Sequence, residues 1–160
     1  MATQDSRDQR TDGATAPEDR DAIRELLHLY CFCMDEGRFA ELGTLFADDG
    51  EWIAPYRHAQ GPTAITAWLT GSVPSSPRRM HYVMNSIIRL AGDTAEAKSN
   101  YLVMVEGTDG PVPSVCGTYA DQLVRQPDGW RFRRRELIHA FKGQMRLNLP
   151  SAAGTGATGS

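Results

Sequence analysis

The sequence predicts an α+β fold in which three N-terminal helices pack on a curved, mostly antiparallel sheet and enclose a cone-shaped α+β barrel. Two observations predict it. Apolar residues recur at helical spacing as far as Gly71, and from Met80 onward the period changes to two. Helices followed by a run of strands, with tight turns between the strands, are typical of this class.

The first predicted helix begins at Thr15-Ala-Pro-Glu18, a capping box with proline in its first turn, and stops before Gly37. Apolar side chains between Ile23 and Met34 share one face of it. Residues 1–14 are polar and 148–160 are rich in Ser, Ala, Gly and Thr, so neither segment can bury enough surface to offset its ordering entropy. We expect disordered tails around one domain at 15–147.

Two shorter helices and one short strand follow. Phe39 to Phe46 predicts a second helix that ends at the turn Asp48-Asp-Gly50, and Trp52 starts a short strand. Gly61-Pro-Thr-Ala-Ile65 opens a third helix, which Gly71 closes.

Four long strands complete the sheet. Turns that contain Gly, Asp and Pro separate them, and they span Met80–Leu90, Ala95–Glu106, Ser114–Arg125 and Trp130–Phe141. In the absence of a bulge, the first strand points His81, Val83, Asn85 and Ile87 into the cone. The open face of such a sheet must be covered, so a homodimer or homotrimer is expected.

Composition excludes several classes of protein. The 160 residues carry a net charge of −3, too weak and too mixed for a nucleic-acid partner. Arg131, Arg133, Arg134 and Arg135 alternate between two strand faces, so some of them are expected as lid or interface cations and no continuous basic patch forms. No apolar run reaches the roughly 18 residues of a membrane span, and the N-terminus lacks a signal-peptide core, so a cytoplasmic protein is expected.

The remaining motifs argue against a metal or cofactor. Cys31, Cys33 and Cys116 are odd in number and badly spaced for a disulfide framework or zinc site, so we expect three buried thiols. Phosphate-binding loops, dinucleotide fingerprints, zinc-protease motifs and nucleophile elbows are absent from the sequence. The expected chemistry uses no cofactor and no metal.

Asp35 and His81 are the candidate catalytic pair. Asp35 lies beside the apolar stripe of the first helix, where a carboxylate must be paired or exposed. A carboxylate on one nitrogen of His81 would leave the other nitrogen free to accept a proton. The alternatives are a solvent carboxylate and a core histidine bonded to backbone. Tyr30 is either a core aromatic or a third catalytic group.

The other candidates are substrate contacts. Aromatic and sulfur side chains would form the walls, with a few polar groups among them. The set is Trp52, Tyr56, Trp68, Met84, Asn85, Glu106, Cys116 and His139. Tyr56 is equally compatible with simple exposure, and Glu106 with a charge at a strand end.

Six motifs occur in an order that resembles the SnoaL-like branch of the nuclear transport factor 2-like superfamily. They are Ile23-Arg-Glu-Leu-Leu with Tyr30 and Asp35, Leu45-Phe-Ala-Asp-Asp-Gly50, Gly61-Pro-Thr-Ala-Ile65, His81-Tyr-Val-Met-Asn85, Gly92-Asp-Thr-Ala95 and Asp128-Gly-Trp-Arg-Phe132. They span about residues 18 to 142. The resemblance implies the cone-shaped fold, whereas the superfamily hosts dehydratases, isomerases, cyclases and non-catalytic subunits.

Within that superfamily the site pattern resembles bile acid 7α-dehydratases and scytalone dehydratases. The resemblance implies that Asp35 and His81 are the acid/base pair, with Tyr30, Tyr56 and Glu106 matching further bile-acid-dehydratase positions. The second histidine of scytalone dehydratases has no counterpart between Val115 and Tyr119.

These observations predict a cofactor-independent lyase or isomerase that acts on a hydrophobic cyclic or polyketide-like molecule in a closed pocket. Two alternatives stay open. One is a cyclase that works mainly through the shape of its pocket, and the other is a non-catalytic binding or association subunit.

Overall fold

The computed structural model describes residues 12–75 and 77–142. Residues 1–11 and 143–160, where most of the two predicted tails fall, lie outside the described residues. The helices are α1 (Asp12–Glu36), α2 (Phe39–Thr44) and α3 (Pro62–Ser72). The strands are β1 (Phe46–Ala54), β2 (Arg57–Gln60), β3 (Arg79–Ala91), β4 (Thr94–Gly107), β5 (Gly110–Gln126) and β6 (Gly129–Lys142).

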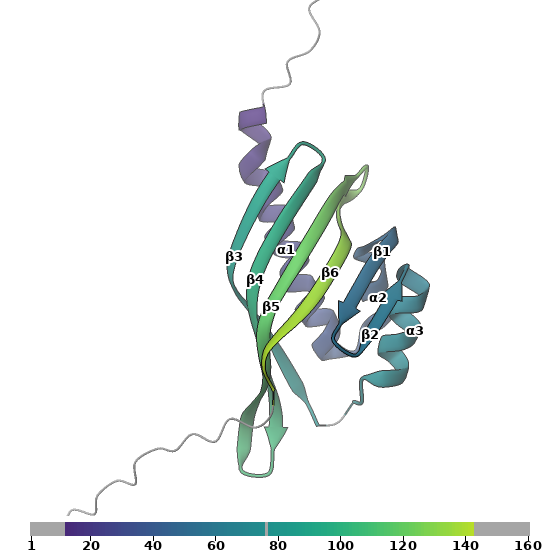
Figure 1. Ribbon diagram of the computed structural model, residues 1–160, viewed down its shortest axis with the longest axis vertical. Coiled ribbons are helices and arrows are strands. Elements are labelled where there is room, and N and C mark those ends of the chain that lie inside the picture. Colours follow the sequence, from purple (N-terminus) through teal and green to yellow (C-terminus); the bar gives the residue numbers. More distant parts are fainter. Residues whose placement is uncertain (1–11, 76, 143–160) are drawn as a thin grey trace, which may run out of the picture.

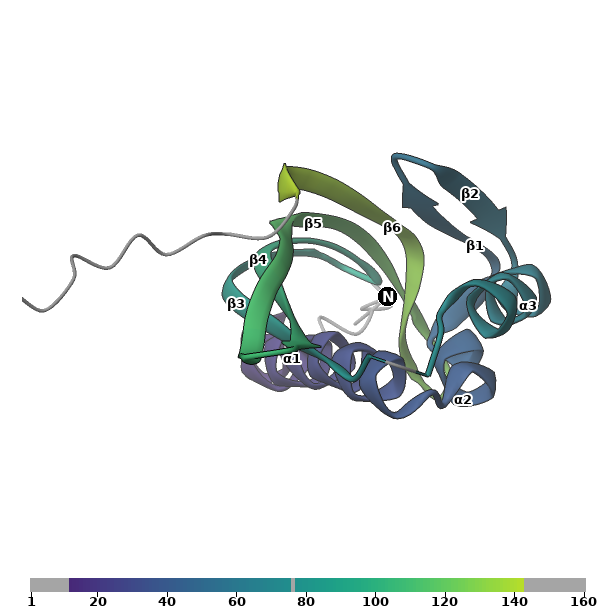
Figure 2. The ribbon, with the colours of Figure 1, turned by 90° about the horizontal axis from the view of Figure 1, so that it is seen from below.

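The strands form one six-stranded sheet in the order β2-β1-β6-β5-β4-β3. All neighbours are antiparallel except β1 and β6, which run parallel. The four long strands arch over α1, while α2, α3, β1 and β2 lie together at one side (Figures 1 and 2). This arrangement confirms the predicted α+β fold with three helices and a mostly antiparallel sheet.

Helix α1 is the long element on which the sheet closes. It ends where Gly37 adopts a φ of 70°, as the sequence predicts. It starts at Asp12, three residues before the predicted cap, so residues 12–14 are helical and Pro17 lies inside the helix. Proline is tolerated there because the carbonyl that it leaves unbonded belongs to the helix start, where water can reach it.

The segment after α2 is more extended than predicted. Helix α2 ends at Thr44, and Phe46 already belongs to β1, which carries a register shift between Phe46 and Glu51. The Asp48-Asp-Gly50 turn is therefore an irregular part of a strand. Strand β2, which is absent from the predicted elements, pairs with β1 over only four residues, too few for a clear period-two pattern.

A bulge in β3 changes which residues face the helix. The pairing with β4 shifts between Met84 and Ile87, and Asn85 takes a φ of 49°. One extra residue switches all later side chains to the opposite face. His81 and Val83 point inward as predicted, but Asn85 is exposed in the bulge and Ile87 is 58% exposed on the outside.

The core lies between α1 and the concave face of the sheet. It combines aliphatic residues of α1 with aromatic residues of β4, β5 and β6. Among these, Tyr101 stacks on Tyr119 with ring centroids 4.3 Å apart, and Phe132 is fully buried. Of the three thiols, Cys31 and Cys33 are buried as predicted, whereas Cys116 is half-buried.

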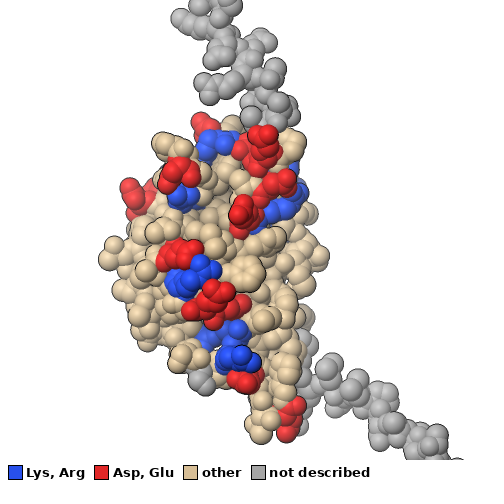
Figure 3. Space-filling model, turned by 180° about the vertical axis from the view of Figure 1, so that it is seen from behind, with Lys and Arg blue, Asp and Glu red and all other residues tan. Residues whose placement is uncertain are grey.

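The surface carries charges of both signs. On the face seen in Figure 3, acidic and basic side chains are interspersed and form no large patch of one sign. No helix in the described part of the chain is long and apolar enough to cross a membrane.

Candidate active site

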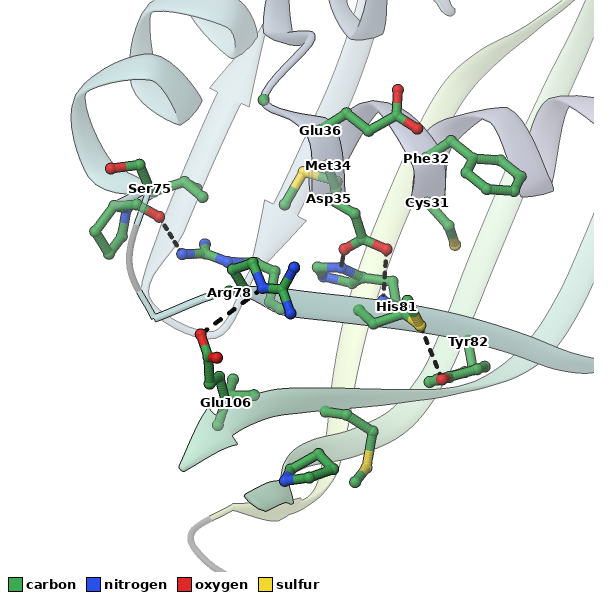
Figure 4. Close-up of a pocket in the computed structure, with 18 of the residues that line it drawn as sticks. Cys31, Phe32, Met34, Asp35, Glu36, Ser75, Arg78, His81, Tyr82 and Glu106 are labelled. Carbon is green, nitrogen blue, oxygen red and sulfur yellow. Dashed lines mark hydrogen bonds and ion pairs between the residues drawn. The ribbon is translucent and has the colours of Figure 1, made fainter. Parts of the chain in front are cut away.

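Asp35 and His81 lie within hydrogen-bonding reach, although 46 residues separate them. The backbone N–H of His81 donates to Asp35 Oδ2 at 2.8 Å, and His81 Nδ1 lies 2.5 Å from Asp35 Oδ1. Figure 4 shows the carboxylate descending from α1 onto both groups. The two side chains are only 16% and 9% exposed.

Two elements bring the pair together. Asp35 lies in the last turn of α1, and His81 lies near the start of β3, the sheet edge that packs against this helix. A carboxylate at a helix C-terminus is disfavoured by the helix dipole and by partial burial. The two donors of His81 offset both costs, so Asp35 occupies the paired position that the sequence analysis expects.

The contact with Asp35 favours one tautomer of the imidazole. An ionised carboxylate can only accept, so the Nδ1 that faces Asp35 carries a proton. In a neutral ring the other nitrogen, Nε2, is then an acceptor. The pair can therefore act as an oriented base, and the carboxylate can stabilise the imidazolium that forms when Nε2 takes a proton.

The pair lies in a pocket of about 1440 Å³. Its walls come from the C-terminal half of α1, the end of α3 with the loop after it, the start of β3, and the β4–β5 hairpin. Phe32, Met80 and Tyr82 line it and are 44–59% exposed. Among the described residues the pocket is therefore an open groove with a buried floor and not the predicted closed pocket, because one loop and one hairpin tip form its rim.

Charged side chains gather at the rim. The Arg78 guanidinium lies 3.7 Å from the Glu106 carboxylate, so Glu106 is a pocket residue held at a strand end (Figure 4). Arg79 also lines the pocket and donates to the carbonyl of Pro74.

Tyr30 lies in the core, apart from this pocket. Its hydroxyl accepts a hydrogen bond from Trp52 Nε1 at 2.8 Å, and its ring meets Tyr119 and Phe132 edge-on. Burial raises the pKa of Tyr30 well above its ordinary value. Neither Tyr30 nor Trp52 is among the described residues that line the pocket, so the structure does not bring them to Asp35 and His81.

Arg135 and Asp121 form a buried ion pair that the sequence analysis did not identify. Two hydrogen bonds of 2.8 Å join them, and both side chains are 0% exposed. Burial lowers the pKa of the guanidinium, but Asp121 outweighs burial and holds that pKa above its ordinary value. Arg135 is thus a core residue instead of a lid or interface cation. The signal that could have indicated this pair is the position of Asp121 between Tyr119 and Leu123, two residues that point inward on β5.

The guanidinium of Arg135 also lies over three aromatic rings, those of Tyr30, Tyr119 and Phe132, at 4.1–4.2 Å from their centroids. Cys31 follows Tyr30 on α1 and lines the pocket. Burial raises the pKa of its thiol to about 11, with Arg135 opposing and Asp35 and Asp121 adding to the shift.

The other candidate contacts lie elsewhere. Met84 is 41% exposed because it alternates with His81 and Val83, so its assignment to the inner wall is wrong. Trp68 of α3 packs beneath the guanidinium of Arg57 of β2. Tyr56 is exposed beside His139. His139 also contacts Tyr101 edge-on. None of these, nor Asn85 or Cys116, is among the described residues that line the pocket.

The described residues contain no group of three or more His, Cys, Asp or Glu side chains that could hold a metal ion. Two of the carboxylates that line the pocket are engaged in pairs, Asp35 with His81 and Glu106 with Arg78.

The chain also matches a known protein family. The SnoaL-like domain matches residues 15–136, which include every element from α1 to the first half of β6. The chain belongs to the SnoaL-like domain family. Both Asp35 and His81 fall within the matched region.

One relative of the chain is the uncharacterized protein Rv2910c of Mycobacterium tuberculosis. The two are 33% identical over 133 residues, which cover 79% of this chain and 89% of the relative. Two solved structures from Novosphingobium aromaticivorans are also similar. An NTF2-like protein with a cystatin-like fold is 29% identical with a TM-score of 0.71, covering 76% of this chain and 81% of that one. A candidate scytalone dehydratase is 26% identical with a TM-score of 0.72, covering 83% and 91%.

Proposed function

We propose that this SnoaL-like protein is a cofactor-independent lyase or isomerase that removes an activated C–H proton from a hydrophobic cyclic or polyketide-like substrate. His81 is the base and Asp35 orients it. The observation that carries the proposal is the pair of hydrogen bonds that the backbone and ring of His81 donate to the Asp35 carboxylate at the floor of an open pocket.

The substrate of this reaction is a ketone with a hydroxyl on the β carbon. Nε2 of His81 takes a proton from the α carbon, and the electron pair of that C–H bond forms the enolate. The enolate then expels the β hydroxyl, which leaves as water after receiving the proton from His81, and an unsaturated ketone remains. If the proton returns to another carbon instead, the product is an isomer.

The pocket wall suits such a molecule. Cys31, Phe32, Met34 and Val83 supply apolar contacts around the pair. The similarity to a candidate scytalone dehydratase agrees with dehydration as the form of the reaction. A positioned base contributes about 10²–10⁴-fold to the rate of proton transfer.

Exchange of substrate protons tests the proposal. A panel of cyclic β-hydroxy ketones is incubated with protein in deuterium oxide, and both deuterium uptake at the α carbon and release of water are followed by NMR. Wild-type protein should promote exchange or elimination with at least one compound, and His81→Ala should abolish it. His58→Ala is the matched control, because His58 pairs with Glu51 at an exposed position outside the pocket.

The two alternative functions give different results. A cyclase that works by shape would keep its activity in His81→Ala and lose it when Val83→Trp fills the pocket. A non-catalytic subunit would bind hydrophobic ligands without exchange in any variant. Either pattern would contradict the proposed base.

A further inference from the structure

One cation in the pocket has no carboxylate partner among the described residues. Arg79 lines the pocket and is half-buried, and its described hydrogen bond goes to the carbonyl of Pro74. The acids of the pocket are each matched elsewhere: Asp35 to His81, Glu36 to Arg38 and Glu106 to Arg78. A guanidinium has five N–H donors, so Arg79 keeps donors for a further acceptor.

Arg79 lies on the same face of the sheet as the proposed base. It precedes His81 by two residues on β3, and the two pair with Val105 and Val103 of β4. Residues two apart on a strand point to the same side and lie roughly 7 Å apart along it. A substrate whose α carbon meets His81 can therefore place its carbonyl oxygen between the imidazole and the guanidinium.

Charge balance favours that placement. The ion pairs Glu36–Arg38 and Glu106–Arg78 each cancel. If His81 is neutral, as a base must be before the reaction, Asp35 and Arg79 remain as opposite charges, and the pocket suits a neutral ketone. Proton transfer creates an imidazolium beside Asp35 and an enolate oxygen that needs a cation. Arg79 supplies that cation, and each new charge then has an opposite neighbour.

We infer that Arg79 is a catalytic residue that binds the carbonyl oxygen of the substrate and stabilises the enolate, which makes neutral enolisable ketones the substrate class. This inference rests on the proposed function. It assigns to Arg79 the hydrogen bond to the enolate, a role that Tyr30 does not fill because its hydroxyl is bound to Trp52 in the core.

A phenolate tests the site without turnover, since a phenolate is a planar oxyanion like an enolate. The probe is 4-nitrophenol, whose coloured phenolate is measured at a pH near its own ionisation. Adding wild-type protein should increase the phenolate fraction, because Arg79 favours the anion. Arg79→Met should bind the probe without that increase, and Arg79→Lys should restore part of it.

The neighbouring arginine provides the matched control. Arg78 lines the same pocket but is 86% exposed and paired with Glu106, so Arg78→Met should keep the increase. His81→Ala should keep it too, which separates Arg79 from the base. The inference is overturned if wild-type protein produces no increase, if Arg79→Met behaves as wild type, or if His81→Ala alone removes the effect.

Turnover provides a second measurement. Arg79→Met should lower kcat for α-proton exchange about 10²–10³-fold, the typical loss for one oxyanion donor, with a smaller change in KM. Equal loss in Arg78→Met would contradict the assignment. If wild-type protein catalyses no exchange, the proposed function fails, while the phenolate experiment still reports on Arg79 by itself.

Discussion

The carboxylate of Asp35 holds His81 at two points, the backbone N–H at 2.8 Å and the ring Nδ1 at 2.5 Å. One contact fixes the start of β3 against the end of α1, and the other fixes the tautomer of the imidazole. Because one carboxylate makes both contacts, the packing of β3 against α1 and the orientation of the imidazole both depend on Asp35.

Asp35→Asn should lower the rate of α-proton exchange by about 10²–10⁴-fold, because the neutral amide no longer stabilises the imidazolium. The double variant Asp35→Asn/His81→Ala should be no slower than His81→Ala alone, since residues that act as a unit are not additive. Exchange rates of the three variants, with circular dichroism to verify folding, provide the measurement. Additive losses would indicate two independent roles.

Periodicity predicted the order of the elements well, because a helix face and a strand face each repeat over many residues. All four long strands lie within a few residues of their predicted bounds. Periodicity fails where a single inserted residue shifts the phase. The bulge at Asn85 in β3 did this, and it placed Asn85 and Ile87 on the surface.

A register shift is also the reason why periodicity did not predict that Arg135 is buried. In β6 the pairing with β5 shifts around Arg133, so Phe132 and Arg135 both point inward although they are three residues apart. A period of two cannot predict that pair. Nor can it predict that Asp35 meets His81, because contacts between separate elements depend on packing. For that contact, the family resemblance was the only guide.

Asp121→Ala should destabilise the fold by about 3–5 kcal/mol, because it leaves the buried charge of Arg135 without its partner. The control is Asp128→Ala, which removes an exposed partner of Arg131 and should cost at most about 1 kcal/mol. Urea denaturation of both variants gives the free energies of unfolding. Equal values for the two would mean that the ion pair contributes no more than a surface pair.

Tyr30→Phe should lower the free energy of unfolding by about 1–3 kcal/mol, because the buried Trp52 N–H loses its acceptor. Catalysis per folded molecule should change little, since the hydroxyl lies outside the pocket lining. Urea denaturation and exchange rates measured on the same samples separate the two effects. A rate loss as large as that of His81→Ala, with unchanged stability, would restore Tyr30 as a catalytic residue.

Cys31 should react slowly with thiol reagents near neutral pH, because burial raises its pKa to about 11 and little thiolate is present. Its labelling rate should rise about tenfold per pH unit until the pH approaches that pKa. Mass spectrometry identifies the labelled residue, and Cys31→Ser is the control. A ligand in the pocket should lower the labelling rate of Cys31. A labelling rate that such a ligand leaves unchanged would place the thiol outside the binding region.

The outer face of β3 should mediate self-association. Met80, Tyr82, Met84 and Ile87 are 41–58% exposed along this edge strand, and an apolar row of that kind is typical of an interface. We therefore expect a homodimer or homotrimer in which this row is covered.

Ile87→Lys should shift the molecule toward monomers in analytical ultracentrifugation, because it would bury a charge without a partner. Glu25→Lys, an exposed change on α1 and not on the outer face of the sheet, should leave the assembly intact. A wild-type protein that stays monomeric at high concentration would contradict the prediction, and so would an assembly that tolerates Ile87→Lys.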